Sequence, residues 1–251
     1  MRNITNKIAW VTGAGTGIGE AGAIKLAQAG MKVILSGRRV EKLQEVAEKI
    51  GPAATIEVLD VSDRDAVAGV ASRIIEKFGS IDVLVNSAGI NVKERNWHNV
   101  SLDDWDKVIR IDLDGAFYCV KAVLPNMIEN KGGLIINISS WAGRFVSVVT
   151  GPAYTAAKHA MNAMNESINM ESGIYGVRAC AICPGEVATP ILDNRPIPVT
   201  DEDKAMMVQA EDCGDIIGFL AQLPDHVCIN QLTVSPTWNR GFVAQAKALQ
   251  S

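Results

Sequence analysis

The stretch "IAWVTGAGTGIG", residues 8–19, joins a short apolar run to a turn that contains four glycines. The apolar run is typical of a buried strand, and the glycines allow a tight turn from that strand into a helix. At such a turn the backbone can approach a pyrophosphate, and the N-terminus of the helix stabilises the negative charge. Any tight strand-to-helix turn uses glycine, so the dinucleotide interpretation depends on the rest of the chain.

The alternation of strand and helix continues along the sequence. Further apolar runs lie at 32–37, 55–60, 81–89, 132–140, 177–185 and 230–236, and helical periodicity appears between them, as at 40–50 and 65–78. Strands that are apolar on both faces and alternate with helices indicate a parallel sheet covered on both sides. We therefore expect an α/β fold with one doubly wound domain over residues 1–251 and a seven-stranded, mostly parallel sheet.

One region departs from this alternation. Between Pro190 and Glu211, Pro190, Pro196 and Pro198 interrupt any regular element. Because mobile loops commonly close such sites, we expect a substrate lid at about 190–211.

Composition narrows the classes of function. With 251 residues and a formal net charge of -4, the chain is not expected to bind nucleic acid or an anionic membrane. We find no apolar run that could span a bilayer and no signal peptide, which favours a cytoplasmic protein. The five cysteines suggest no disulfide framework. Cys180 and Cys183 are spaced like a redox or zinc pair, but "VRACAIC" (177–183) reads as an apolar strand, so we interpret both as core residues.

The stretch "GPAYTAAKHAM", residues 151–161, places Tyr154 and Lys158 four positions apart. In a helix these two residues lie on one face. An adjacent ammonium favours the phenolate and so lowers the pKa of a tyrosine, which suits a proton-transfer role. The alternative is that the tyrosine packs in the core and the lysine extends to solvent.

Several motifs, taken together, resemble those of the short-chain dehydrogenase/reductase family. They are T-G-x-x-x-G-x-G at 12–19, "NSAG" at 86–89, Ser140, Tyr154-x-x-x-Lys158 and "PG" at 184–185. The resemblance covers almost the whole chain and implies a Rossmann fold with hydride transfer between a nicotinamide cofactor and an alcohol or carbonyl. It implies that Tyr154 is the acid/base, that Lys158 lowers its pKa and holds the nicotinamide ribose, and that Ser140 binds the substrate oxygen. Ser139 would face the opposite side of the strand.

The choice of cofactor is indicated by "SGRR", residues 36–39, at the end of the second predicted strand. NAD-specific sites usually have an acid about 20 residues beyond the glycine loop, whereas this chain has Gly37 followed by two arginines. Guanidinium groups suit a 2′-phosphate, so we expect NADP, with NAD as the alternative if the arginines are only a solvated helix start. The expected cofactor contacts are Gly13, Gly15, Thr16, Gly17, Ile18, Gly19, Arg38, Arg39, Asp60, Val61, Asn86, Ala88, Gly89, Tyr154, Lys158, Pro184, Gly185, Val187 and Thr189.

One candidate catalytic residue departs from the family pattern. "IDLDGAF", residues 111–117, has Asp112 where the family usually has asparagine, whose backbone carbonyl holds a water that links the lysine to solvent. Any residue retains that carbonyl, but a carboxylate changes the local charge. The fragment lacks the ligands of a calcium loop, so no metal is expected.

For the substrate we expect contacts from Ser140, Trp141, Tyr154 and Glu186. Arg195, in the lid, either recognises a carboxylate or is simply solvated.

The leading interpretation is an NADP(H)-dependent carbonyl reductase or alcohol dehydrogenase acting on a small molecule. The alternatives are an NAD-dependent alcohol dehydrogenase, a C=C reductase and a non-catalytic cofactor-binding regulator. C=C reductases of this fold space the tyrosine and lysine more widely, and a regulator would have lost Ser140, Tyr154 or Lys158. The resemblance also implies a homodimer or homotetramer, built partly on the helix that holds Tyr154.

Overall fold

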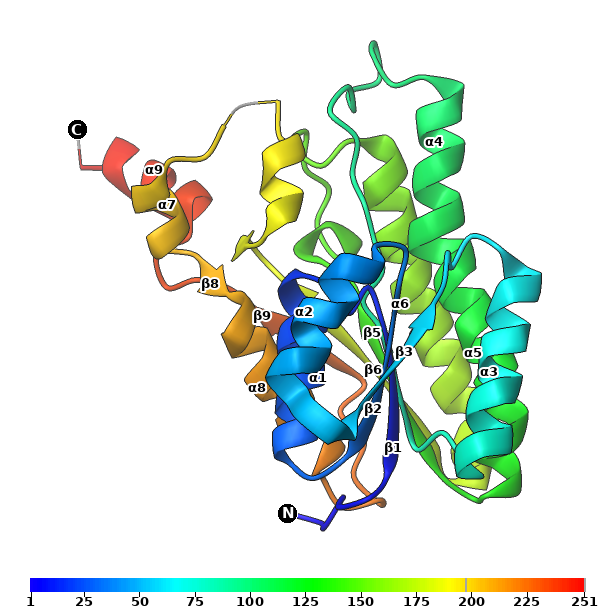
Figure 1. Cartoon of the computed structure of the whole chain (residues 1–251). Coiled ribbons are helices and arrows are strands. Elements are labelled where there is room, and N and C mark those ends of the chain that lie inside the picture. The colour runs from blue at the N-terminus through cyan, green and yellow to red at the C-terminus, as the bar shows by residue number, and fades with distance from the viewer. Residues whose placement is uncertain (197, 251) are drawn as a thin grey trace.

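The computed structural model describes residues 1–196 and 198–250, and a seven-stranded sheet runs through its middle (Figure 1). The strand order is β3-β2-β1-β4-β5-β6-β9, and each neighbouring pair is parallel. The strands are β1 (Ile8–Thr12), β2 (Lys32–Gly37), β3 (Ala54–Val58), β4 (Val83–Asn86), β5 (Gly133–Ile138), β6 (Val177–Pro184) and β9 (Gln231–Val234). The expected α/β fold with a seven-stranded sheet is confirmed.

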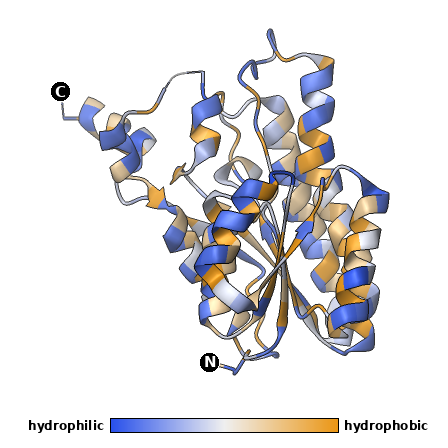
Figure 2. Ribbon diagram, viewed as in Figure 1, coloured by the Kyte–Doolittle hydropathy of each residue, from blue (hydrophilic) through white to orange (hydrophobic). Residues whose placement is uncertain are grey.

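Helices cover both faces of the sheet because both faces are apolar. Ala9 and Val11 of β1 pack on one side, and Ile8 and Trp10 pack on the other. The first side is covered by α1 (Gly17–Gln28), α2 (Val40–Ile50) and α8 (Ala210–Ala221), and the second by α3 (Arg64–Phe78), α5 (Gly115–Glu129) and α6 (Pro152–Ser172). Figure 2 shows apolar residues on these helices alternating with polar ones, as burial of one helix face requires.

The order in which the strands are added to the sheet reverses at β1, which lies between β2 and β4. Connections from β1 lead outward to β2 and β3, and the chain then crosses to β4 on the other side. The loops after β1 and β4 therefore diverge, which is where open α/β sheets bind ligands. Thr12 joins these two loops, because its Oγ1 accepts hydrogen bonds from the N–H groups of Ser87 (3.2 Å) and Ala88 (3.3 Å).

Three helices lie toward the end of the molecule where the strands finish: α4 (Leu102–Ile109), α7 (Asp201–Ala205) and α9 (Arg240–Ala248). The segment 190–211 is less irregular than the prolines suggested. It contains a 3₁₀ turn (Pro190–Asn194), α7 and β8 (Val208–Gln209), which pairs with β7 (Val187–Ala188). Position 197 of the expected lid lies outside the described residues. Among the described residues, no helix is long and apolar enough to cross a membrane.

Cys180 and Cys183 are buried, and neither forms a disulfide. Cys180 packs in the apolar cluster under α1, α2 and α8, whereas the sulfur of Cys183 lies 3.7 Å from Oδ1 of Asn162 on α6, at the other face. Burial raises the pKa of the Cys180 thiol to about 12. The interpretation of both as core residues is confirmed.

Candidate active site

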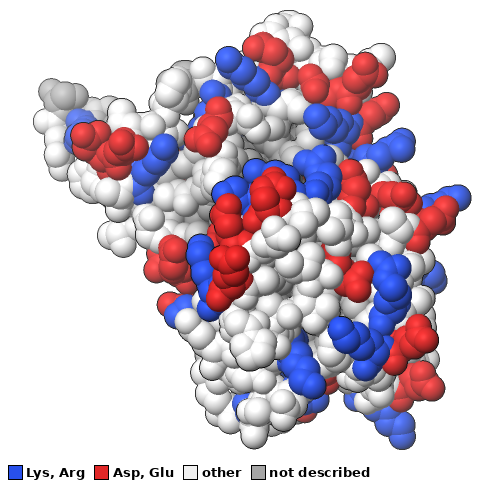
Figure 3. Space-filling model, viewed as in Figure 1, with Lys and Arg blue, Asp and Glu red and all other residues white. Residues whose placement is uncertain are grey.

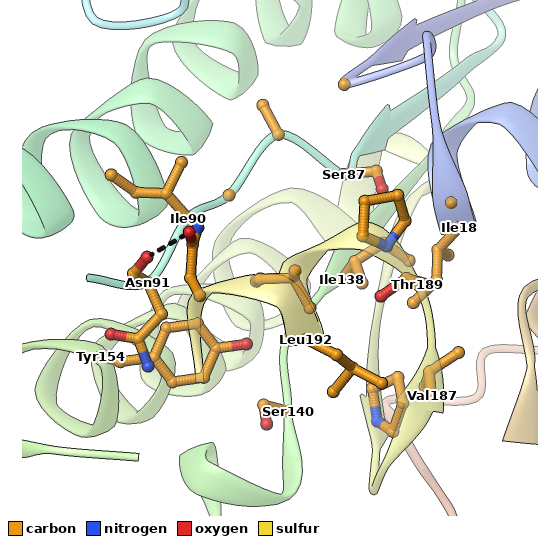
Figure 4. Close-up of a pocket in the computed structure, with 18 of the residues that line it drawn as sticks. Ile18, Ser87, Ile90, Asn91, Ile138, Ser140, Tyr154, Val187, Thr189 and Leu192 are labelled. Atoms are coloured by element: carbon orange, nitrogen blue, oxygen red, sulfur yellow. Dashed lines mark hydrogen bonds between the residues drawn. The ribbon is translucent and has the colours of Figure 1, made fainter. Parts of the chain in front are cut away.

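A cavity of about 760 Å³ opens at the carboxyl ends of the strands (Figure 4). Most of the residues expected from the sequence line it: Gly13, Gly15, Thr16, Gly17, Ile18, Arg38, Arg39, Asp60, Val61, Ala88, Gly89, Ser140, Trp141, Tyr154, Lys158, Pro184, Gly185, Glu186, Val187 and Thr189. Gly19, Asn86 and Asp112 are not among the lining residues. These three lie behind the cavity wall.

The glycine-rich turn is shaped by close backbone contacts. Gly13 has a φ of +65°, and a Cβ there would lie 2.7 Å from the backbone nitrogen of Ala88. A Cβ on Gly19 would lie 2.3 Å from the carbonyl oxygen of Gly13. Side chains at either position would separate α1 from the loops after β1 and β4. Gly15 and Gly17 line the cavity and form a glycine cradle at the start of α1.

Asn86 belongs to a buried chain of amides beneath the cavity floor. Its Nδ2 donates to Oδ1 of Asn137 at 2.9 Å, and Nδ2 of Asn137 donates to Oδ1 of Asn165 at 3.0 Å. These hydrogen bonds connect β4 and β5 to α6, the helix that carries Tyr154 and Lys158. The Oδ1 atom of Asn86 has no hydrogen-bond partner among the described residues.

Tyr154 and Lys158 lie on one face of α6, and Nζ of Lys158 is 5.3 Å from the centroid of the Tyr154 ring. Figure 4 shows the Tyr154 hydroxyl directed into the cavity, on the same side as Ser140 and Leu192. Tyr154 is only partly buried, whereas Lys158 is 3% exposed. The helix thus presents its phenol to the cavity and holds its ammonium below.

Ser139 and Ser140 have different environments at the end of β5. The hydroxyl of Ser139 is buried and donates to the backbone carbonyl of Lys158 at 3.2 Å. The hydroxyl of Ser140 accepts the N–H of Ala142 at 3.1 Å and begins the short turn Trp141–Gly143. Ser140 also lowers the pKa of Tyr154 through a side-chain hydrogen bond, although burial is the larger influence and raises that pKa. Of the two serines, Ser140 is therefore the one that lies beside the tyrosine at the cavity.

Asp112 is fully buried beneath Lys158, in a π-helical turn (Arg110–Asp114) between α4 and α5. Its Oδ2 lies 3.3 Å from Nζ of Lys158, and its Oδ1 accepts the N–H of Ile90 at 2.8 Å. Nζ of Lys158 also donates to the carbonyl of Ile138 at 3.1 Å. Because a π turn inserts one extra residue into the helical ladder, it changes which side chains point inward. The carboxylate is thus fixed against the lysine.

The charges of these groups are interdependent. Burial raises the pKa of Asp112, and the Lys158 ammonium and the Ile90 N–H only partly offset this effect. Burial lowers the pKa of Lys158, but Asp112 and Tyr154 outweigh burial and raise it, so the ammonium persists. Burial raises the pKa of Tyr154, Lys158 opposes this, and Asp112 adds to it. Lys158 lowers the pKa of Tyr154, as expected from the sequence. Burial and the Asp112 carboxylate outweigh this effect, so the net pKa of Tyr154 is raised.

Basic residues lie at the end of the cavity formed by β2 and α2. Figure 3 shows Lys and Arg side chains gathered there, close to the start of α2. Arg38 is 58% exposed and lies 4.0 Å from Asp60, and Arg39 makes a 3.4 Å contact with the hydroxyl of Thr16. The carboxylate of Asp60 accepts hydrogen bonds from the backbone and hydroxyl of Ser62. Both guanidinium groups are thus open to an anion at this end.

The other end of the cavity carries charged groups that pair with each other. Glu186 forms salt bridges with Arg195 (2.6 Å) and Arg240 (2.5 Å), and Arg240 also contacts Asp203 at 3.0 Å. Burial raises the pKa of Glu186, but hydrogen bonds from Arg240 and Arg195 outweigh burial and lower it. Arg195 is therefore held by Glu186 rather than simply solvated.

Two arginines that line the cavity were not among the expected site residues: Arg95, in the loop after β4, and Arg240, at the start of α9. The ring of Trp141 packs on the rings of Phe145 and Phe242, with centroid distances of 5.3 and 5.6 Å respectively. No sequence signal marks Arg240, because 54 positions separate it from Glu186. Arg95 follows the "NSAG" motif within a loop that has no pattern of its own.

Known proteins resemble this chain over nearly its full length. The sequence pattern described as short chain dehydrogenase matches residues 7–197. An uncharacterized oxidoreductase of Staphylococcus saprophyticus is 35% identical over 240 residues, which cover 94% of this chain and 100% of that protein.

Two solved structures share both fold and sequence with this chain. The closed form of a serine dehydrogenase complexed with NADP+ has a TM-score of 0.84 at 33% identity and covers 92% of this chain and 96% of its own. An alcohol dehydrogenase from the archaeon Thermococcus sibiricus, complexed with 5-hydroxy-NADP, has a TM-score of 0.84 at 26% identity, with coverage of 93% and 98%.

Proposed function

Because the chain belongs to the short-chain dehydrogenase family of oxidoreductases, we propose that it transfers hydride between NADP(H) and a carbonyl or secondary alcohol, with Tyr154 as acid/base. The observation that carries this proposal is the convergence of Ser140, Tyr154 and Lys158 on a cavity that also contains a glycine cradle and two open arginines. Both solved relatives described above were bound to NADP or a derivative of it.

The residues present fit a bound NADP(H). Gly13, Gly15 and Gly17 line the cavity at the N-terminus of α1, which would stabilise a pyrophosphate. Arg38 and Arg39 would hold the 2′-phosphate, and Asp60 and Val61 would lie along the adenine. Ala88, Gly89 and Lys158 would hold the nicotinamide ribose, and the loop Pro184–Thr189 would contact the nicotinamide and phosphates. When bound, the reduced cofactor supplies a hydride to the carbonyl carbon.

In the reducing direction the chain has to deliver a proton to the carbonyl oxygen. Tyr154 would donate it, and its raised pKa keeps the phenol protonated at neutral pH. Ser140 would donate a hydrogen bond to the same oxygen and hold it beside the phenol. Lys158 would stabilise the resulting phenolate, and Asp112 fixes the ammonium in place. In the oxidising direction the same phenolate would accept the proton of the alcohol.

Three alternative functions have less support. A non-catalytic cofactor-binding protein would not need Tyr154, Ser140 and Lys158 to lie together at one cavity wall. A C=C reductase of this fold would need a wider spacing between tyrosine and lysine than four positions on α6. An NAD-dependent enzyme would require an acid at the position of Gly37, which here lines the cavity without a side chain.

The proposal is tested by following a labelled hydride. The purified protein is incubated with NADPH, deuterated at C4 of the nicotinamide, and a panel of ketones, diketones and keto acids, and then in parallel with deuterated NADH. We expect deuterium at the carbinol carbon of at least one product, with NADPH used more efficiently than NADH. A protein that binds NADPH but transfers deuterium to none of these carbonyls would contradict the proposal.

A further inference from the structure

Arg95 lies in the cavity wall between two loops, and only 6% of its surface is exposed. Its Nη1 contacts the carbonyl of Val149 at 3.5 Å, and its Nη2 donates to the carbonyl of Asn194. Its Nε has no partner among the described residues. Buried N–H groups of a guanidinium are usually satisfied, so an unpaired one in a cavity wall indicates a ligand atom.

The charge of Arg95 is also uncompensated. Within the described residues it forms no salt bridge, whereas the other cations at this end of the cavity are paired. Lys158 faces Asp112, and Arg195 shares Glu186 with Arg240. Burial lowers the pKa of Arg95, the positive charge of Arg195 lowers it further, and Tyr154 opposes them only in part. A buried charge without a counter-ion is costly, and binding of an anion would remove that cost.

The position of Arg95 relative to the reaction centre is fixed by its backbone. A Cβ on Gly151, the residue before α6, would lie 2.3 Å from the carbonyl oxygen of Arg95. The loop that carries Arg95 therefore packs directly on the start of the helix that carries Tyr154. Arg95 and Tyr154 both line this cavity. Burial raises the pKa of Tyr154, and Arg95 is one of the charges that oppose this rise. A ligand at Arg95 would extend from the carbonyl held at Tyr154.

We propose that the carbonyl substrate carries a carboxylate, which the Arg95 guanidinium binds while Tyr154 and Ser140 hold the carbonyl oxygen. This inference rests on the proposed function and specifies its substrate class as keto acids and the corresponding hydroxy acids. One uncompensated cation matches the single charge of a carboxylate. The apolar wall formed by Trp141 and Leu192 suits the short carbon chain between the two groups.

Calorimetry on the complex with NADP+ tests the inference without turnover. Butanoate and butanamide have nearly the same shape and differ in charge, so they isolate the contribution of the carboxylate. A charge-assisted hydrogen bond to a buried guanidinium predicts that butanoate binds about ten- to a hundredfold more tightly. Equal affinity for the two ligands would overturn the inference.

Substitutions then assign the preference to Arg95. Arg95→Gln retains an amide donor for the backbone carbonyls of Val149 and Asn194 but removes the charge, so it should lose the preference for butanoate. Arg95→Lys keeps the charge and should retain part of the preference for butanoate. The matched control is Arg144→Gln, because Arg144 is exposed and bonds Gln231 outside the cavity. An unchanged preference in Arg95→Gln, or an equal loss in Arg144→Gln, would overturn the inference.

Kinetics separate this inference from the proposed function. In wild-type protein, 4-oxopentanoate should be reduced with a kcat/KM at least about tenfold above that of its methyl ester. In Arg95→Gln the ratio should approach one, chiefly through the KM of the acid. Reduction of the ester without any preference for the acid would overturn the inference and leave the proposed function standing. Failure to reduce any carbonyl would instead contradict the proposed function.

Discussion

Asp112 and Lys158 form a buried ion pair 3.3 Å apart, directly below the tyrosine that we propose as the acid. An unpaired carboxylate in this position would be costly, and the pair is supported by the N–H of Ile90 and the carbonyl of Ile138. The sequence shows the departure from the family asparagine. It could not show whether the side chain faces Lys158, because that depends on the π turn at Arg110–Asp114.

The carboxylate should control the pH dependence of the reaction. Asp112 adds to the effect of burial in raising the pKa of Tyr154, because a phenolate near a carboxylate is disfavoured. In Asp112→Asn that charge is removed, so the pKa of Tyr154 should fall and the base should be available at lower pH. We expect kcat/KM for alcohol oxidation to rise at lower pH than in wild type, while maximal turnover stays within about tenfold.

The measurement is a pH profile of kcat/KM, with Asp106→Asn on the exposed face of α4 as the control. A profile that moves to higher pH, or does not move, would contradict the charge argument. A loss of nearly all turnover with intact cofactor binding would assign the carboxylate a direct role in the chemistry.

At the scale of elements, the loop between β2 and α2 should select the cofactor. Arg38 is largely exposed, and its ion pair with Asp60 is long, at 4.0 Å. Little therefore holds the Arg38 side chain when no phosphate is present. Charge-assisted hydrogen bonds to a phosphate are typically worth about 1.5–3 kcal/mol. We therefore expect Arg38→Ala to weaken NADPH binding more than tenfold and NADH binding much less, as measured by fluorescence titration. Equal loss for both cofactors would show that Arg38 does not recognise the phosphate.

The junction between the Arg95 loop and α6 gives a prediction about stability. Gly151 has a φ of +75°, and a Cβ there would collide with the backbone of Arg95. Gly151→Ala should therefore lower the free energy of unfolding in urea by about 1–3 kcal/mol. The control is Gly173→Ala at the other end of α6, where φ is -59° and no atom lies within 4 Å. That variant should be neutral or more stable by up to about 1 kcal/mol, and similar losses in both variants would disprove the argument.

The elements were largely predictable because the core has regular patterns. β2 and α2 coincide with the predicted ranges 32–37 and 40–50, since a continuous apolar run and a helical apolar pattern determine which side chains are buried. The cavity lining was predictable where the glycine turn and the strand ends supply it. Arg95 and Arg240 were not, because loops after β4 and β9 place them through tertiary contacts that leave no local pattern.

At the scale of the whole molecule, we expect a homodimer or homotetramer. Apolar side chains remain exposed on the helices of one face, including Phe117 on α5 (50% exposed) and Met170 on α6 (84% exposed). Exposed apolar groups of this size on neighbouring helices favour association. Light scattering should give two or four times 26.8 kDa, and Phe117→Glu should shift the protein toward the monomer. Val58→Glu, at an equally exposed position on β3, should leave the oligomeric state unchanged. A monomeric wild-type protein would refute the expectation.

The molecule as a whole separates the tyrosine from most of the cofactor contacts. The proposed contacts come from the loops after β1, β2, β3 and β6, whereas Tyr154 is contributed by α6. Loss of its hydroxyl should therefore remove proton transfer without removing cofactor binding. Lys158→Met, in contrast, should impair both, because Lys158 is placed to hold the ribose as well as the phenolate.

The central claim, that Tyr154 is the proton donor of an NADP(H)-dependent reductase, is tested most directly by Tyr154→Phe. This change keeps the ring and deletes only the hydroxyl, and general acid–base catalysis contributes about 10²–10⁴-fold. Turnover of the best carbonyl substrate and the dissociation constant for NADPH are measured on the same preparation. We predict that kcat falls at least about 100-fold while NADPH affinity changes less than about threefold. Near-normal turnover, or an equal loss of NADPH binding, would contradict the account.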